Sequence, residues 1–290
     1  MNYQLQTINS DQTGFERIAG LYQSAKNLFA DKLTIDLSGA SFFDANMASP
    51  LGTVLARITD KLNSIEFVNI PKKIEEILRR NLFLTNFQFP ELADHFGTTM
   101  PYLRLQTTDG RSFEDYIQRE FRGKGIPRMS EKLSKMFKKK VFEVFQNAVI
   151  HSETTLGVCV CGQYYPNVKR LDIAVTDAGV GIREKVREYF NNQKISSVAA
   201  IQWALKEHNT TKRGPQPGGL GFKFLHEFIS RNKGKIKIAS RFGFYQYENG
   251  SQSFSKMAAD FPGTAVTIEI NTADTTNYYL LSEARPGNVS

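Results

Sequence analysis

The sequence predicts an α/β protein that folds in two parts, and three observations lead to this expectation. The first 90 residues alternate between short apolar strands and helices. The remainder carries a long helix followed by a series of strands. A length of 290 residues with 41% hydrophobic content is enough for two domains that each bury a core. We place these domains at residues 1–92 and 102–275, with a linker at 93–101 and a polar tail at 276–290.

The first part is expected to form a small open sheet covered by helices. Apolar runs predict three strands, at residues 4–8, 33–37 and 65–70. Amphipathic periodicity predicts three helices, at residues 14–30, 47–62 and 71–83. Pro71 suits the start of the last helix, because proline is tolerated in the first helical turn.

A strand leads through a short loop into a helix in the segment LTIDLSGASFFDANMASPLGTVLARI. This arrangement resembles the sulfate-transporter and anti-sigma-factor-antagonist (STAS) domain. In signalling members of that family, the loop carries a phosphorylated Ser or Thr just after an Asp. Here Ala45 and Asn46 follow Asp44, and Ser41 and Ser49 do not match the pattern. The resemblance implies a docking module whose loop is not a phosphoacceptor, and a generic α/β domain is the alternative.

The second part is expected to combine helices with a larger set of strands. Helices are predicted at residues 112–121, 130–152 and 220–232. Strands are predicted at residues 103–106, 156–164, 168–176, 235–240, 242–247 and 265–270. A mobile region is expected between residues 182 and 217.

Glu143, Asn147 and His151 recur every four residues in VFEVFQNAVIHSETT, residues 141–155. On a helix, this spacing places the three polar side chains along one stripe. Apolar residues such as Phe145 and Val149 occupy other positions. Taken alone, this pattern favours an ordinary amphipathic helix with a solvated polar stripe, so a functional interpretation depends on other parts of the chain.

Three further clusters fall where the chain turns. In LDIAVTDAGVGI, Asp177 ends a strand, where a carboxylate can accept a hydrogen bond from an exocyclic amine. The glycines that follow it let the backbone approach a ligand. In GPQPGGLGFKFLHEFI, glycines precede a helix, whose N-terminal N–H groups suit phosphate oxygens. Gly263 and Thr264 enter the strand AVTIEI. Each cluster alone also fits a plain turn, helix entry or strand start.

In this order and at these separations, the four clusters resemble the ATPase superfamily of gyrase, ninety-kilodalton heat-shock chaperones, histidine kinases and mismatch-repair ATPases (GHKL). The resemblance covers residues 100–270. It implies a two-layer α/β sandwich that binds ATP and Mg²⁺, with Asn147 on the metal and Asp177 on the adenine amine. The other positions that it assigns to the nucleotide are Gly179, Gly181, Gly219, Leu220, Gly221 and Thr264.

The same resemblance assigns the reacting groups. Glu143 matches the position that activates the attacking water or hydroxyl, one helical turn before Asn147. A carboxylate there can take a proton from the nucleophile while Mg²⁺ offsets the developing charge. His151 matches a frequent family residue, and a buried histidine satisfied by local hydrogen bonds is the alternative.

The segment HNTTKRGPQPGGLGF is similar to the nucleotide lids of histidine kinases and anti-sigma-factor serine kinases. We include Thr211 and Lys212 among the nucleotide-binding residues, because Lys212 and Arg213 would reach phosphate oxygens when the lid closes. An exposed basic loop is the alternative. Ile201 and Trp203 are interpreted as anchors of the lid.

Charge, cysteine content and hydropathy bear on nucleic-acid binding, on disulfides and on membrane association. The net charge of +8 and a basic run between Arg119 and Lys140 raise a nucleic-acid hypothesis, but no nucleic-acid-binding motif accompanies them, so we favour a solvated helix face. Cys159 and Cys161 lie two apart in a predicted strand and are expected to be buried or half-buried reduced thiols. The sequence has neither a run of 18 apolar residues nor a signal peptide, which predicts a cytoplasmic protein without membrane association.

Together these features predict a Mg²⁺-dependent ATP-binding protein with slow ATPase or serine/threonine-kinase activity in bacterial regulatory signalling. The alternative is an ATP-gated protein-interaction module with negligible turnover. The expected partners are ATP and a regulatory protein, and a homodimer is one oligomeric state to consider.

Overall fold

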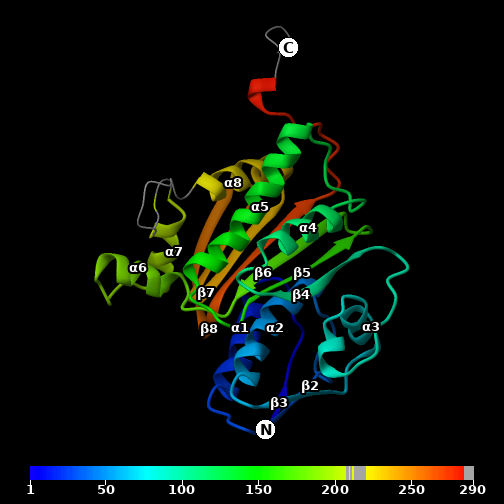
Figure 1. Ribbon diagram of the computed structural model, residues 1–290, viewed down its shortest axis with the longest axis vertical. Helices are drawn as coiled ribbons and strands as arrows, with labels where there is room; N and C mark the ends of the chain where they lie inside the picture. Colours follow the sequence, from blue (N-terminus) through cyan, green and yellow to red (C-terminus); the bar gives the residue numbers. More distant parts are fainter. Residues whose placement is uncertain (207–208, 210, 212–219, 284–290) are drawn as a thin grey trace.

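A computed structural model describes residues 1–206, 209, 211 and 220–283 of the protein (Figure 1). The chain forms a three-stranded parallel sheet and a five-stranded antiparallel sheet, both accompanied by helices. This is the mixed α/β class that the sequence predicts. In the part of the chain that the structure describes, no helix is both long and apolar enough to cross a membrane.

The N-terminal unit, residues 1–90, alternates strands and helices. Its elements are β1 Asn2–Gln4, α1 Gln12–Ala25, β2 Lys32–Asp36, α2 Ala48–Thr59, β3 Ser64–Val68 and α3 Lys72–Arg80. The strands lie in the order β1-β2-β3 and are parallel, because α1 and α2 provide the crossovers between them. Asp11 caps α1, since its carboxylate accepts a hydrogen bond from the Gly14 backbone N–H at 2.8 Å.

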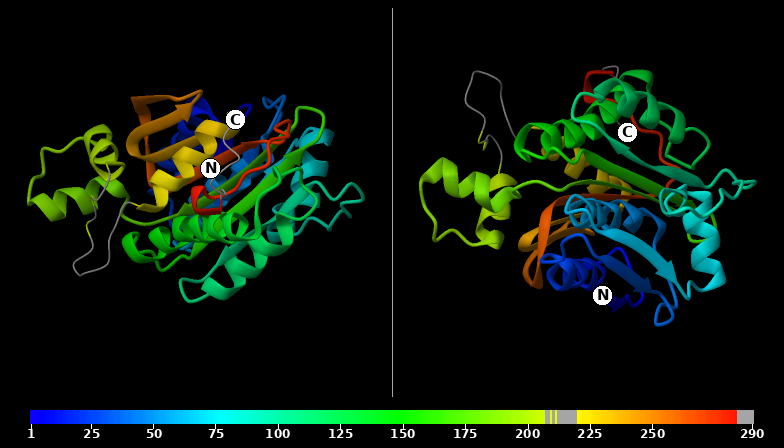
Figure 2. Two further views of the ribbon diagram at one scale, coloured as in Figure 1. Left: turned by 90° about the horizontal axis from the view of Figure 1, so that it is seen from above. Right: turned by 60° about the horizontal axis from the view of Figure 1, so that its bottom comes forward.

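The larger sheet has the strand order β4-β5-β6-β8-β7, which places β6 at its centre. Its strands are β4 Thr99–Leu105, β5 Val158–Tyr165, β6 Arg170–Asp177, β7 Lys235–Glu248 and β8 Ser251–Asn271. The accompanying helices are α4 Gly110–Glu120, α5 Glu131–His151, α6 Ile182–Phe190, α7 Ser197–Ala204 and α8 Leu220–Asn232. Figure 2 shows the sheet between a helical layer that contains α4 and α5 and the N-terminal unit.

Alternating side chains along β5 reveal the two faces of this sheet. Val158 and Val160 belong to the apolar core beneath α4, α5 and α8. Cys159 and Cys161 point the other way and belong to a core that also contains Phe15 and other residues of the N-terminal unit. The N-terminal unit thus shares its core with the sheet, although the sequence led us to expect a separate core for each part.

Several elements differ from the sequence-based expectation. Residues 182–204, expected to be part of a mobile region, include helices α6 and α7. Two predicted strands merge into β7, and β8 begins at Ser251, well before the predicted start. Asn249 and Gly250 form the two-residue turn between them, where both have positive φ as a type I′ turn requires. β4 begins at Thr99, inside the segment taken as a linker.

Candidate functional site

A cavity of about 180 Å³ lies between the C-terminal half of α5 and the helix-covered face of the sheet. Apolar side chains form much of its wall, including Val144, Val175, Val186, Ile238 and Val266. Polar groups reach it from α5, β6, α6 and β8, and these are Asn147, His151, Asp177, Lys185 and Thr264. An apolar pocket with a few convergent polar groups is the usual make-up of a small-molecule site.

Asp177 ends the central strand β6, and the residue is only 3% exposed. Its Oδ1 accepts a hydrogen bond from the Gly179 backbone N–H at 2.8 Å. Burial raises the pKa of Asp177 to about 7, although hydrogen bonds from the backbone of Gly179 and Thr264 and the charge of Arg57 oppose the shift. A ligand N–H group that donates to this carboxyl would favour its ionised form.

The loop after Asp177 packs against the end of α5. The Val180 backbone N–H donates to the Ser152 carbonyl at 2.9 Å. Position 179 accepts no larger residue, because a Cβ there would lie 2.0 Å from the Ser152 carbonyl oxygen. This close contact explains how Asp177 and the α5 residue Asn147 come to line one cavity.

Thr264 lines the cavity from β8, directly after Gly263. Gly263 has φ +120°, and a Cβ there would lie 2.0 Å from the Asp177 carbonyl oxygen. The Thr264 hydroxyl lies 3.0 Å from the hydroxyl of Ser240. Ser240 also accepts a hydrogen bond from the Ile182 backbone N–H at 2.9 Å, so it joins β7, β8 and the start of α6. Ser240 lies inside β7, and a single hydroxyl there has no pattern by which the sequence could reveal it.

Glu143 does not line the described cavity. Its Oε1 accepts a hydrogen bond from the Lys140 ammonium at 2.7 Å, and both side chains are part-buried. It lies one helical turn before Asn147, which is half-buried and faces the cavity. The structure therefore brings Asn147 and His151 to the cavity but leaves the proposed general base in an ion pair beside it.

The predicted lid is described only in part. Lys212 and Gly219, with Thr210, Arg213 and Gly218, lie outside the described residues. The Thr211 hydroxyl lies 3.2 Å from Nδ1 of His151, and both residues line the cavity. Leu220 and Gly221 begin α8.

Aromatic side chains join α6 to α7 beside the cavity. The Trp203 ring lies 5.3 Å, between centroids, from each of Tyr189 and Phe190. Trp203 also lines the cavity, so it contacts the site as well as anchoring the helices. Ile201, the other predicted anchor, is 1% exposed.

Helix α2 of the N-terminal unit contacts the end of β6 and the loop after Asp177 from the opposite face of the sheet. The sequence did not reveal these contacts. The Ser49 hydroxyl hydrogen-bonds to the Thr176 hydroxyl and to the Cys159 carbonyl, both at 2.9 Å. One turn and two turns later, Thr53 and Arg57 reach the end of β6 and the loop beyond it. The residues next to Asp177 are thus held by the N-terminal unit.

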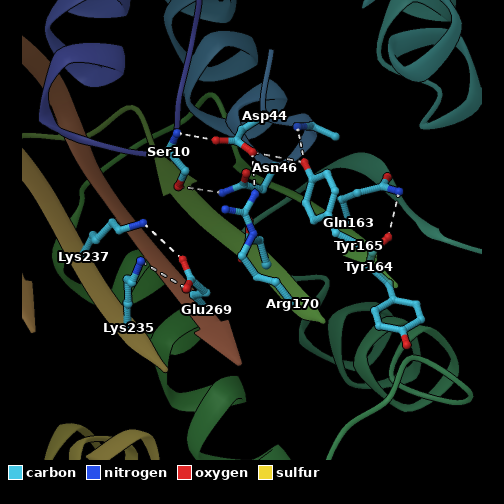
Figure 3. A network of polar contacts seen from close by, with 12 residues as sticks. Ser10, Asp44, Asn46, Gln163, Tyr164, Tyr165, Arg170, Lys235, Lys237 and Glu269 are labelled. Carbon is cyan, nitrogen blue, oxygen red and sulfur yellow. Dashed lines mark hydrogen bonds and ion pairs between the residues drawn. The ribbon is translucent and has the colours of Figure 1, made fainter. Parts of the chain in front are cut away.

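Asp44 lies in a polar network between the N-terminal unit and the sheet (Figure 3). Its Oδ1 accepts from Nη2 of Arg170 at 2.7 Å, and its Oδ2 accepts from the Ser10 backbone N–H at 2.7 Å. Arg170 also lies 3.0 Å from Asp172, whose pKa burial raises to about 8. Ala45 and Asn46, which follow Asp44, are both 0% exposed. The loop that we compared with the phosphorylated STAS loop is therefore buried between the N-terminal unit and the larger sheet.

The two cysteines are buried free thiols, as predicted. Burial raises the pKa of both thiols, which keeps them protonated at neutral pH.

No protein-family model matches the sequence, and a comparison with curated proteins gives no match.

Proposed function

We propose that this protein binds ATP together with Mg²⁺ in the cavity between α5 and the larger sheet, and that the bound nucleotide serves regulatory signalling. The observation that supports this most is that Asn147, Asp177 and Thr264 line one cavity. They come from three separate elements, and the GHKL resemblance assigns all three to the nucleotide or its metal.

The chemistry of the cavity suits an adenine base. The Asp177 carboxylate accepts hydrogen bonds from the backbone of Gly179 and Thr264, and its two oxygens retain lone pairs that can accept another from the exocyclic amine. Apolar side chains such as Val175, Ile238 and Val266 would cover the faces of the ring. The low exposure of Asp177 would strengthen this hydrogen bond and make a base without the amine costly to bind.

The phosphates and metal would lie toward α8 and Asn147. Helix α8 begins at Leu220, and a helix N-terminus offers backbone N–H groups and a positive dipole end to phosphate oxygens. The amide oxygen of Asn147 is a hard ligand of the kind that Mg²⁺ accepts. Because Mg²⁺ usually combines one or two protein ligands with substrate phosphates and water, a single amide fits this role.

Calorimetric titration with ATP tests the proposal directly. We expect one-site binding in Mg²⁺ that weakens when EDTA replaces the metal. Asn147→Ala should remove this metal dependence, whereas Asn86→Ala, an amide of the N-terminal unit that does not line the cavity, should bind as the wild type does. Absence of any ATP binding by the wild type would reject the proposal.

A second candidate is an interaction module that ATP gates with negligible turnover. The pairing of Glu143 with Lys140 favours it, because a carboxylate that binds an ammonium and does not line the cavity is not placed to take a proton from a nucleophile there. The buried Asp44 loop favours it too, since this loop and the cavity lie on opposite faces of the sheet. Transfer of a phosphoryl group to that loop within one chain would have to cross the sheet.

Two measurements separate the candidates. Release of γ-phosphate should depend on Glu143 if the protein is an enzyme, so Glu143→Ala would abolish it. If the protein is a gated module, wild type and Glu143→Ala would both show negligible release. In that case, capture of its regulatory partner should differ between ATP and ADP and persist with a non-hydrolysable ATP analogue.

A further inference from the structure

Arg57 projects from α2 to the loop between β6 and α6. Its Nε donates a hydrogen bond to the Ala178 carbonyl at 2.8 Å. Its Nη2 contacts the same carbonyl and the Gly179 carbonyl, the latter at 3.2 Å. Arg57 is part-buried, so these contacts are partly shielded from water. The N-terminal unit thus holds the backbone that follows Asp177.

The peptide group between Ala178 and Gly179 is held at both of its polar ends. Arg57 donates to its carbonyl oxygen, and its N–H donates to Oδ1 of Asp177 at 2.8 Å. Because a peptide group is planar, holding the carbonyl also sets the direction of the N–H. The position of Arg57 therefore bears on the orientation of the Asp177 carboxylate.

Gly179 makes this restraint necessary. Only glycine fits at this position, because a Cβ would lie 2.0 Å from the Ser152 carbonyl oxygen. A peptide followed by glycine can turn over at little cost, since glycine adopts both signs of φ. Such a flip would remove the N–H from Asp177. The tight packing against α5 thus requires glycine at position 179, and glycine restrains the Ala178–Gly179 peptide less than any other residue would. The hydrogen bond from Arg57 to the Ala178 carbonyl supplies the missing restraint.

We infer that Arg57 is a positioning residue for adenine recognition, and that the N-terminal unit thereby forms part of the nucleotide site. This inference rests on the proposed function. Arg57 acts through the Ala178–Gly179 peptide and not on the nucleotide itself. A partner that displaces α2 would lower the affinity for ATP, and bound ATP would lower the affinity for that partner by the same factor.

The test compares ATP with inosine triphosphate, which carries a keto oxygen where ATP carries the exocyclic amine. The measured quantity is the ratio of the two dissociation constants from calorimetry. Wild type should prefer ATP, and Arg57→Ala should lower this preference about tenfold, which corresponds to about 1.4 kcal/mol. Arg57→Lys keeps a charged donor group but loses the planar fork of the guanidinium, and it should give an intermediate ratio.

Arg170→Ala is the matched control, because Arg170 also joins the N-terminal unit to the sheet but contacts Asp44 instead of the loop. It should leave the ratio unchanged even if it lowers the melting temperature. A second measurement needs no nucleotide: amide hydrogen exchange in residues 177–182 should be faster in Arg57→Ala than in Arg170→Ala. If Arg57→Ala does not fold, Arg57→Lys takes its place in both measurements.

The outcomes distinguish this inference from the proposed function. If wild type binds neither nucleotide, the proposed function fails and this inference fails with it. If wild type prefers ATP but Arg57→Ala keeps the full preference, only the role of Arg57 is refuted. An equal loss of preference in Arg57→Ala and Arg170→Ala would also refute it, because general weakening of the interface would then be the cause.

Discussion

The buried carboxyl of Asp177 should make the protein less stable as the pH rises, and Asp177→Asn should remove this effect. In the folded protein the pKa of Asp177 is raised from 3.8 to about 7, mainly by burial. Between these values the folded state holds a proton that the unfolded state has lost. The contribution of Asp177 to the free energy of unfolding therefore falls from about pH 4 to about pH 7 and levels off above it.

The size of the effect follows from the shift. A difference of about 3 pKa units at about 1.4 kcal/mol per unit gives at most about 4 kcal/mol. Asparagine retains an oxygen that can accept the Gly179 N–H but carries no charge. At pH 8, Asp177→Asn should thus be more stable than wild type by up to about 4 kcal/mol, and the difference should vanish near pH 4.

Urea denaturation at pH 4, 6 and 8 measures this difference, and calorimetry on the same samples measures ATP binding. Asp177→Asn should bind ATP far more weakly, because its amide N–H₂ group faces the exocyclic amine of adenine. Asp172→Asn is the matched control, since it removes a buried carboxyl of the same strand that does not line the cavity, and it should still bind ATP. A variant that is less stable than wild type at pH 8, or that binds ATP equally well, would refute this reasoning.

Three further substitutions test the surroundings of Asp177. Gly263→Ala should destabilise the fold by about 2 kcal/mol or more in urea denaturation, because its Cβ would lie 2.0 Å from the Asp177 carbonyl oxygen at φ +120°; an unchanged midpoint would contradict this. Ser49→Ala should cost about 1–3 kcal/mol in the same assay, since it leaves the buried Thr176 hydroxyl without that partner; a cost below about 0.5 kcal/mol would show that the contact contributes little. Thr264→Val should weaken ATP binding in calorimetry several-fold by removing a hydroxyl from the cavity, and equal affinity would remove Thr264 from the site.

The sequence predicts most helices and strands of both units because their apolar residues follow clear periods. It does not predict the first half of β8, whose segment SQSFSK is largely polar. That stretch is a strand because it pairs with β7 across the Asn249–Gly250 turn. Strand formation of this kind depends on the partner strand, which no local pattern describes.

The residues of the candidate site also fall into those that the sequence predicts and those that it does not. Asn147 and Asp177 were recognisable, because each stands in a motif with fixed spacing and a clear place on a helix or strand. Arg57 and Ser240 were not, because a lone arginine on a helix and a lone serine within a strand have no distinguishing pattern. Their roles follow from contacts with the Asp177 loop and the start of α6, which only the packing of distant segments creates.

The most direct test of the account is a crystal structure of the protein with Mg²⁺ and a non-hydrolysable ATP analogue. We expect the adenine amine within hydrogen-bonding distance of the Asp177 carboxylate and the metal on the Asn147 amide oxygen. A nucleotide bound at another place, or one whose base and metal contact neither residue, would contradict the central claim that α5 and the end of β6 form one ATP site.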